Sequence, residues 1–288
     1  MAQGGTRVMH QRRLRAELRR IREGAGCTQK SVAEAMGWST SKVIRMETGV
    51  VNVSTSDVMA LLLYYGITEP DRTEELLAIS RTKEEMWWDR YREFSTPDFF
   101  NFLDYENSAS EIRHYVGFVL PGLLQTEDYA RAVISGQISD PEGIEREVQI
   151  RLRRQELLAN KEGLRAWYII DEAALHRWIG GREVLMRQLV VLKEMTEWPN
   201  LSIRVVPHTV GMHPGLMRRS FMIFDFSADD EESIVNIEDP HKDKLIQVDQ
   251  ATNSEFVKRF QALEDVAADE AESGKLIDSA LERVRMST

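Results

Sequence analysis

The sequence predicts a mainly helical N-terminal domain followed by an α+β domain with a small, mostly antiparallel sheet. Two observations support this fold class. Apolar residues recur at helical spacing in the first half of the chain, whereas β-branched and aromatic runs typical of strands begin only at Arg165. The chain also has 288 residues, 42% of them hydrophobic, which is enough for two domains with separate cores.

The first helix is expected from Gln11 to Glu23, after a mobile lead at residues 1–9. Its apolar residues are three or four positions apart, arginines occupy the opposite face, and Gly24 ends it. The inward-facing residues are Leu14, Leu18 and Ile21.

Two short helices follow between Thr28 and Gly49. Thr28 is placed to cap the first of them, because its hydroxyl accepts an N–H that the first turn leaves unpaired. Gly37 ends that helix, because glycine adopts a left-handed backbone without a Cβ penalty. The next helix opens at Ser39. Two helices joined by a tight glycine turn form a helix-turn-helix unit, whose second helix enters the DNA major groove.

Two further helices complete a five-helix head, residues 10–82. Ser54 and Asp57 have the spacing of a capping box at the start of the fourth helix, and the fifth is expected from Pro70 to Arg81. The core residues expected after the first helix are Val32, Ala33, Met36, Val43, Met46, Val58, Leu61, Leu62, Tyr65, Leu76, Leu77 and Ile79.

Several motifs of the chain match known families. In the head, the matching residues are Arg22, Thr28, Gln29, Ala33, Gly37, Ser39, Glu47, Thr48 and Gly49. At this spacing, residues 10–66 resemble the phage-repressor and Cro class of DNA-binding domain, often called Xre-type. The stretches Pro121–Ala132, Asp171–Arg177 and His213–Gly215 are similar to the domain that follows such a head in many actinobacterial regulators, including WhiJ-like ones.

The resemblance implies which head residues meet DNA. The positions that face base edges are Thr40, Ser41 and Arg45. The expected phosphate contacts are Thr28, Gln29, Lys42, Asn52 and Ser54. Arg45 is the best candidate for base readout, because a guanidinium pairs bidentately with guanine O6 and N7. The alternative is that Arg45 and Lys42 belong to an ordinary solvated helix face. The family commonly has glutamine where Thr40 stands, so its glutamine-to-adenine contact does not carry over.

Other head residues are expected to be structural. Arg22 and Glu47 match an ion pair that ties the first helix to the end of the third, so their loss should destabilise the head without changing which bases are read. Trp38 is expected to pack. Cys27, the only cysteine, is expected to be a small buried residue between helices, which is compatible with a reducing cytoplasm.

Charge is distributed unevenly along the chain. The net charge is −10, yet residues 1–66 carry ten Lys and Arg residues against five acidic ones. The remainder carries 27 basic and 42 acidic residues. Because salt screens charges beyond ~10 Å, a distant acidic body need not cancel a basic head. We expect the body to repel DNA and to orient the head toward it.

The second domain is expected at residues 97–288, after a docked aromatic linker at 83–96 that contains Trp87, Trp88 and Tyr91. Its first element is expected to be a single long helix, Phe99–Val119. Further helices are expected after Thr126 and at Glu142–Leu158, Arg182–Glu197 and 253–288. Strands are expected at Arg165–Ile170, Ser202–Val206, Ser220–Phe226 and Ile234–Glu238, with another at Lys244–Val248.

Three functions compete for the second domain: a sensor or partner-binding module, a dimerisation body, and an enzyme. The resemblance favours the first, since genes for such regulators often neighbour a small acidic partner protein and the pairs are sometimes described as antitoxin-like. A hypothetical ligand or partner groove is formed by Pro121, Gly122, Leu124, Gln125, Thr126 and His213. Its alternative is a turn that connects helices and packs against the sheet.

No catalytic residue, metal site or cofactor is predicted. His208 and His213 are five residues apart, near Pro and Gly, and they form neither an HExxH helix nor a cysteine-rich zinc pattern. A turn is expected around His241, between Asp239 and Asp243. The sequence also lacks a GxSxG motif and a phosphate-binding glycine loop. The histidines are therefore expected to be structural or loop residues.

Together these patterns predict a cytoplasmic, nucleoid-associated transcription regulator that binds double-stranded DNA. No apolar run approaches the ~20 residues that cross a bilayer. A head of this size contacts about half a DNA site, so a homodimer on an inverted repeat is expected. The chain lacks coiled-coil heptads, so the second domain is expected to dimerise and to receive a signal from a protein or a small molecule.

Overall fold

The N-terminal helices form where the local signals place them. A computed structural model describes residues 7–47, 51, 53–81, 86–226, 233–237 and 250–287. The head consists of α1 (Arg7–Gly24), α2 (Gln29–Met36), α3 (Thr40–Glu47), α4 (Thr55–Tyr64) and α5 (Pro70–Arg81). The lead expected at residues 1–9 needs a correction, because helical backbone already begins at Arg7. No glycine or proline occurs between Gly5 and Gly24, so nothing in the sequence interrupts the helix there.

Side-chain caps and a glycine turn set the ends of the short helices. The Thr28 hydroxyl accepts the Ser31 N–H at 3.1 Å, and the Ser31 hydroxyl accepts the Thr28 N–H at 2.9 Å. Gly37 has φ +65° and ends α2. Ser54 caps α4 by accepting the Asp57 N–H at 3.1 Å. The predicted caps at Thr28 and Ser54 and the predicted stop at Gly37 are confirmed.

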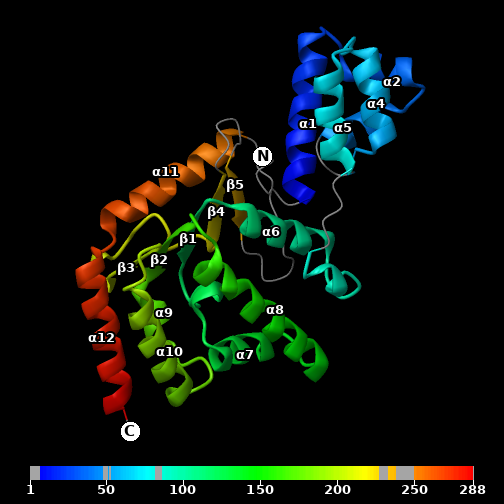
Figure 1. The fold of residues 1–288 in the computed structure, drawn as a ribbon. Coiled ribbons are helices and arrows are strands. Elements are labelled where there is room, and N and C mark those ends of the chain that lie inside the picture. Colours follow the sequence, from blue (N-terminus) through cyan, green and yellow to red (C-terminus); the bar gives the residue numbers. More distant parts are fainter. Residues whose placement is uncertain are drawn as a thin grey trace. The chain divides into compact units, whose positions relative to one another are not determined.

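One apolar core holds the five head helices together (Figure 1). Its buried residues are Leu14, Leu18, Val32, Ala33, Val43, Met46, Val53, Val58, Leu61, Leu62, Leu76 and Leu77. Four further residues that the helical spacing predicted as inward-facing, Ile21, Met36, Tyr65 and Ile79, are partly buried against this core. Trp38 and Cys27 also pack against it, in line with their predicted structural roles.

The chain divides into two compact units, Met1–Arg90 and Tyr91–Thr288. This division falls inside the linker expected at 83–96, of which residues 82–85 lie outside the described part. The residues after the short 3-10 helix η1 (Asp89–Tyr91) belong to the second unit, where Arg92 lies 5.3 Å from the Phe100 ring and Arg146 lies 4.3 Å from the Phe94 ring. Trp88 is buried.

The second unit contains a five-stranded sheet and helices, which confirms the α+β class. Its elements in chain order are α6 (Pro97–Ser108), β1 (Glu111–Val116), η2 (Gly122–Leu124), α7 (Glu127–Ser135), α8 (Pro141–Asn160), β2 (Arg165–Asp171), α9 (Glu172–His176), α10 (Arg182–Met195), β3 (Leu201–Val206), η3 (His208–Val210), β4 (Phe221–Asp225), β5 (Ile234–Ile237), α11 (Gln250–Val266) and α12 (Glu270–Met286). The strand expected at Lys244–Val248 lies outside the described residues.

The prediction of one long helix at Phe99–Val119 is wrong. α6 ends at Ser108, and residues Glu111–Val116 form β1, the central strand of the sheet. The alternation in EIRHYV is a strand pattern, but no glycine or proline separates it from the helix before it. Pairing with β2 on one side and β4 on the other gives this segment its extended form.

The sheet is mixed and not mostly antiparallel. In the order β3-β2-β1-β4-β5, β1 pairs with β2 and β2 with β3 in parallel, whereas β4 pairs antiparallel with β1 and β5. The sequence pattern does not predict β1, and so it does not predict that β1, β2 and β3 form a parallel set. The carboxyl ends of β1, β2 and β3 therefore lie along one edge of the sheet.

Helices cover both faces of the sheet (Figure 1). On one face, Phe221 and Ile223 of β4 belong to a core that includes Phe256 and Phe260 of α11. The alternate residue Phe224 faces the other way and contacts Phe102 of α6, with ring centroids 5.8 Å apart. A buried, bidentate ion pair between Glu106 and Arg154, at 2.7 and 2.8 Å, joins α6 to α8 on that face.

The outer edge of β3 is bonded to the connection between α11 and α12. The Val205 N–H donates to the Ser273 hydroxyl at 2.9 Å, and the Val205 carbonyl accepts the Ala268 N–H at 2.9 Å. The Arg204 guanidinium donates to the carbonyls of Ala267 and Ala268 at 2.6 and 2.8 Å. Backbone groups that would otherwise be open for strand pairing are thus satisfied within the chain.

Candidate nucleic-acid interface

The recognition helix α3 has one buried and one exposed face. Val43 and Met46 are each 3% exposed and face the core. All three residues predicted to read bases, Thr40, Ser41 and Arg45, are exposed. At 100° per residue they lie on one side of an eight-residue helix, so the structure brings them together on a surface open to a ligand.

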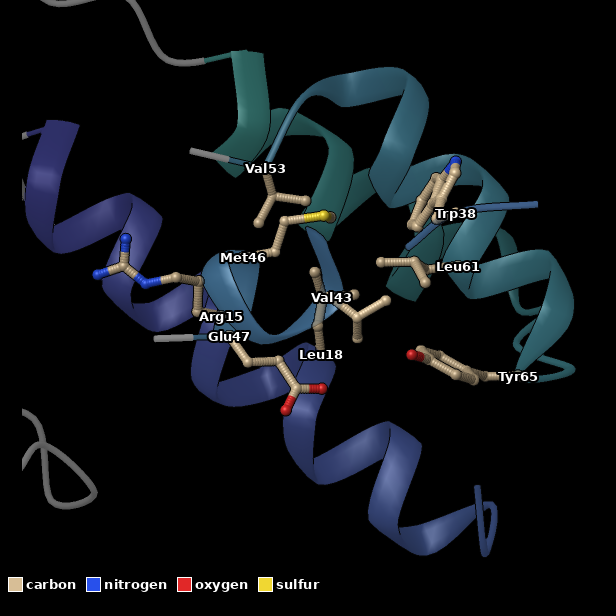
Figure 2. Close-up of a pocket in the computed structure, with 9 residues that line it drawn as sticks. All are labelled: Arg15, Leu18, Trp38, Val43, Met46, Glu47, Val53, Leu61 and Tyr65. Atoms are coloured by element: carbon tan, nitrogen blue, oxygen red, sulfur yellow. The ribbon is translucent and has the colours of Figure 1, made fainter. Parts of the chain in front are cut away.

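Apolar contacts fix how α3 sits in the head. Figure 2 shows Val43 and Met46 around a small cavity, together with Leu18 of α1, Leu61 of α4 and Tyr65, which directly follows α4. Because helix interiors are closely packed, these contacts determine which side of α3 faces outward. The packing of the head's own core therefore determines which residues of α3 are exposed.

Ile44 is a residue of this face that the sequence reasoning missed. It lies four positions after Thr40, and its side chain is 40% exposed. An aliphatic side chain in a polar reading face has a chemical use, because thymine presents a methyl group in the major groove. Helical spacing from Thr40 could have identified it.

Arg45 lies along its own helix. Its Nε donates to the Ser41 carbonyl at 3.3 Å, a contact one turn back on α3. Both residues are exposed, and the guanidinium is a planar donor group of the kind that recognises guanine.

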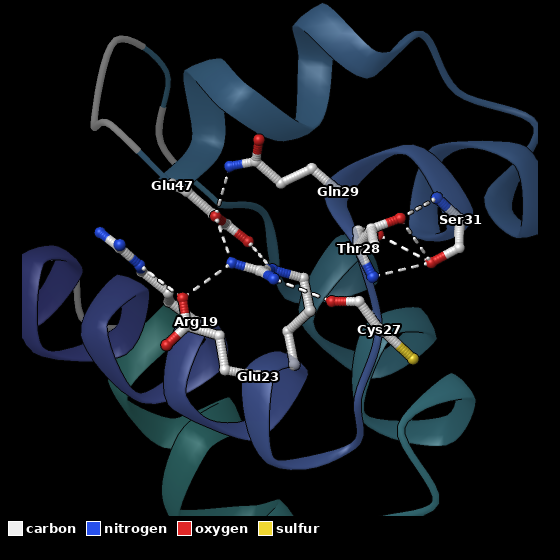
Figure 3. A network of polar contacts seen from close by, with 8 residues as sticks. Arg19, Glu23, Cys27, Thr28, Gln29, Ser31 and Glu47 are labelled. Atoms are coloured by element: carbon white, nitrogen blue, oxygen red, sulfur yellow. Dashed lines mark hydrogen bonds and ion pairs between the residues drawn. The ribbon is translucent and has the colours of Figure 1, made fainter.

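Glu47 lies beside Gln29 in a polar network (Figure 3), and Arg22 is bonded to it. Arg22 Nε donates to Glu47 Oε1 at 2.6 Å, and Nη2 donates to Oε2 at 3.1 Å. The hydrogen bond that Arg22 donates to Glu47 raises the pKa of Arg22 above its ordinary value, although burial acts in the opposite direction. Arg22 Nη1 also donates to the Cys27 carbonyl at 2.9 Å. The network joins α1, the end of α3 and the loop before α2.

Gln29, a predicted phosphate contact, belongs to the same network. Its side-chain amide donates to Glu47 Oε2 at 2.7 Å. The side chain is thereby held at the first residue of α2, where backbone N–H groups at the helix N-terminus favour anions.

Lys42 is engaged by neighbouring side chains. Its Nζ lies 2.9 Å from Asp57 Oδ1 and 3.7 Å from the centre of the Trp38 ring. Burial raises the pKa of Asp57, but hydrogen bonds from Lys42 and Ser54 outweigh it and hold that pKa below its ordinary value. The structure thus gives Lys42 a connection from α3 to α4, and a phosphate would have to compete with Asp57 for it.

The remaining predicted phosphate contacts are at helix N-termini or outside the described residues. Thr28 and Ser54 are exposed caps of α2 and α4. Asn52 lies outside the described residues, as do Thr48 and Gly49 of the matching motif.

In the second unit, the segment of the hypothetical groove is bonded to α8 and α10. Gln155 of α8 donates to the carbonyls of Gly122 and Gln125 at 3.0 and 2.6 Å. The Thr126 N–H donates to Gln188 of α10 at 2.6 Å, and Thr126 caps α7. Gln125 and Leu124 are buried, and Gly122 and Pro121 start the turn of η2. This pattern agrees with the alternative of a packed connecting turn.

His213 has neighbours of its own. Its Nε2 lies 3.0 Å from Asp171 Oδ2, and its Nδ1 accepts the Gly215 N–H at 3.2 Å. Asp171 uses its other oxygen to cap α9 through the Ala173 N–H. Among the described residues, the hydrogen bonds of His213 go to Asp171 and Gly215, whereas those of the Pro121–Thr126 segment include bonds to α8 and α10.

His208 is placed with residues that the sequence reasoning did not consider. Its ring lies near the His176 ring and the Glu172 carboxylate, and the ligand atoms of the three side chains are within 4.8 Å of one another. Burial raises the pKa of Glu172, but hydrogen bonds from the His208 N–H and from His176 keep that pKa below its ordinary value. Glu172 and His176 have a visible i, i+4 spacing, whereas His208 follows a different strand. Asp239, His241 and Asp243 lie outside the described residues.

Comparison with known families gives two matches. Residues 13–76 match a model described as a helix-turn-helix domain. Residues 99–279, more than half of the chain, match a model described as domain of unknown function (DUF5753). The chain belongs to the DUF5753 family. No curated protein and no solved structure matches this chain.

The DUF5753 match includes Pro121–Ala132, Asp171–Arg177 and His213–Gly215, and the helix-turn-helix match includes α2 and α3. A helix-turn-helix domain indicates a DNA-binding regulator of transcription, and such domains are typically not catalytic. Among the described helices, none combines the length and apolar character of a bilayer span.

Proposed function

We propose that this DUF5753 protein is a sequence-specific transcription regulator that binds an inverted repeat as a homodimer. The exposed face of α3 carries the proposal: it presents Thr40, Ser41 and Arg45 from a helix whose opposite face is fixed in the core. A helix of this kind fits the major groove, where base edges carry a distinct pattern of donors and acceptors.

Base readout rests on two kinds of contact. Arg45 donates to guanine O6 and N7, and Ile44 packs on a thymine methyl group. Thr40 and Ser41 bond several bases and discriminate less. A mixed sequence with a guanine as its strongest position is therefore the expected half-site.

Phosphate contacts position the head. Thr28 and Gln29 begin α2, and Ser54 begins α4, so both helices offer backbone N–H groups and a positive dipole end to the DNA backbone. Asn52 contributes from the loop before α4, and Lys42 contributes its charge beside Asp57.

Dimerisation follows from the size of the reading surface. One α3 of eight residues covers only a half-site, so high affinity requires a second head one helical turn away. The second unit supplies the contact between protomers.

Signal reception is assigned to the second unit. Large apolar side chains are exposed in segments that follow the carboxyl ends of the parallel strands: Phe118 after β1, Trp178 after β2 and α9, and Met212 and Met217 between β3 and β4. Exposed apolar groups of this size on one edge of a sheet suit a protein partner or a hydrophobic effector.

A second candidate function uses the same edge. In it the chain is antitoxin-like, and its main role is to bind and neutralise a small neighbour-encoded protein. The exposed apolar side chains, Phe118, Trp178, Met212 and Met217, favour it, together with the resemblance to actinobacterial, WhiJ-like regulators with Xre-type heads. Both functions place the protein in the cytoplasm on the nucleoid.

Selection from a random duplex library with the full-length protein tests the first function. We expect an enriched motif with two-fold symmetry and half-sites about one helical turn apart. Sedimentation of the free protein should give a dimer. A library with no enriched sequence would refute the proposal. If the neighbour-encoded protein binds tightly and DNA binding is the same with and without it, the antitoxin-like function is favoured over signal reception.

A further inference from the structure

Three donor side chains meet where two parallel strands end. Glu172 directly follows β2, and His208 follows β3 after one proline. Because β2 and β3 are parallel neighbours, with Asp171 paired to Val206, their carboxyl ends lie side by side. His176 lies one turn after Glu172 on α9 and so faces the same side.

The three groups are close to the spacing that a metal ion requires. Glu172 Oε1 lies 3.3 Å from His176 Nε2, the rings of His176 and His208 have centroids 5.8 Å apart, and all three ligand atoms lie within 4.8 Å of one another. Ligands at ~2.1 Å from a tetrahedral Zn²⁺ are ~3.4 Å apart. Small rotations of the exposed His208 ring cover the remaining difference.

The surrounding bonds hold these groups in place without an ion. Glu172 Oε2 accepts the His208 backbone N–H at 2.7 Å, which fixes the carboxylate relative to η3. Asp171 caps α9 and binds His213, which fixes the start of the helix that carries Glu172 and His176. Supporting bonds of this kind orient metal ligands in proteins.

The donor types select the metal. Two imidazoles and one carboxylate are a common set of three protein ligands for Zn²⁺, with a fourth position left for water or another ligand. Mg²⁺ and Ca²⁺ prefer sites made of oxygen atoms. Partial exposure of all three residues leaves an entry path from solvent.

We propose that Glu172, His176 and His208 bind a divalent transition metal ion, with Zn²⁺ as the best fit. The site departs from the sequence-based expectation that the chain has no metal ligands. It uses no residue of α3, because its donors all come from the second unit. The competing interpretation is a hydrogen-bonded Glu172–His176 pair beside a solvated histidine.

Calorimetric titration of chelator-treated, full-length protein with ZnCl₂ tests the site. We expect one equivalent to bind in the wild-type protein. His208→Ala should lower the affinity at least ~10-fold. His208 donates its backbone N–H to Glu172, and the alanine variant keeps this hydrogen bond, so it should keep its fold. His176→Ala should have a similar effect.

His10→Ala is the matched control, because it removes an imidazole from α1 in the other unit and should leave the affinity unchanged. Titration with MgCl₂ should give no binding heat. Thermal unfolding gives a second readout: Zn²⁺ should raise the melting temperature of the wild-type protein but not that of His208→Ala. The proposal would be overturned if the wild-type protein does not bind Zn²⁺, or if both cluster variants bind Zn²⁺ as tightly as the wild-type protein does.

Discussion

At the scale of single residues, Arg45 is expected to contribute to base recognition but not to the stability of the head. Its side chain is exposed on α3, and its Nε donates to the Ser41 carbonyl of the same helix. Arg45→Ala should weaken binding to the selected operator by ~1–3 kcal/mol and relax the preference at one base pair, with an unchanged melting temperature. Fluorescence anisotropy with a set of single-base operator variants measures both effects.

Arg81→Ala is the control for charge, because Arg81 is an exposed arginine at the end of α5, outside the helix-turn-helix unit. It should leave base preference intact. If Arg45→Ala binds the operator as tightly as wild type, Arg45 is not part of the readout.

Glu47 has the opposite profile, since it is largely buried and accepts bonds from Arg22 and Gln29. Glu47→Gln should destabilise the head by ~2–4 kcal/mol, because it removes the buried counter-charge of the Arg22 guanidinium and leaves only the exposed Glu23 carboxylate beside it. The ratio of affinities for matched and mismatched operators should stay the same. Thermal unfolding and the anisotropy assay check the two halves of this prediction.

Glu34→Gln is the matched control. Glu34 is exposed and lies 3.9 Å from Lys30, so its loss should change stability by less than ~0.5 kcal/mol. Equal stability of the two variants would show that the Arg22–Glu47 pair contributes no more than a surface pair.

At the scale of elements, the segment between β3 and β4 is fixed by a close approach of backbone to ring. A Cβ on Gly215 would lie 2.2 Å from Cζ of Tyr115, a ring that is 1% exposed. Gly215→Ala should therefore cost ~1–3 kcal/mol or more in unfolding free energy. Chemical denaturation followed by circular dichroism measures the change.

Gly117→Ala controls for this prediction at the same tyrosine. A Cβ there would lie 3.7 Å from the Tyr115 hydroxyl, an ordinary contact. If both alanine variants unfold at the same denaturant concentration, the tight packing of Gly215 is not a source of stability.

The elements also show how far the sequence could predict the fold. Helices of the head were predictable because their signals are local: Thr28 and Ser54 cap, Gly37 turns, and apolar residues repeat. β1 was not, because its extended form depends on pairing with β2 and β4, which are distant in the chain. Because β1 could not be predicted, the sequence offered no reason to expect that β2 and β3 are parallel.

The same reasoning applies to the candidate sites. Positions on α3 follow from helical spacing and resemblance, so Thr40, Ser41 and Arg45 were identifiable, although Ile44 was passed over. The cluster of Glu172, His176 and His208 depends on the order of strands in the sheet. A search for short metal motifs cannot find ligands whose proximity is created by strand pairing.

At the scale of the whole molecule, the net charge is −10 but the N-terminal segment is basic, which leads to a prediction about the salt dependence of DNA binding. Affinity for operator DNA should fall steeply as salt rises from ~50 to ~200 mM, as for proteins that release counterions from DNA. Heparin, a polyanion, should compete with operator DNA for the protein, and its affinity should fall with salt in the same way. If affinity does not change with salt, phosphate contacts by the head are excluded.

The bonded edge of β3 restricts how two copies of the second unit can associate. Val205 and Arg204 already use their outward groups on Ala267, Ala268 and Ser273, so another polypeptide cannot extend the sheet from that side. In the part of the chain that the structure describes, the other edge strand is β5, with four residues. Strand addition at β3 is thus disfavoured, which favours helix or loop surfaces for a homodimer.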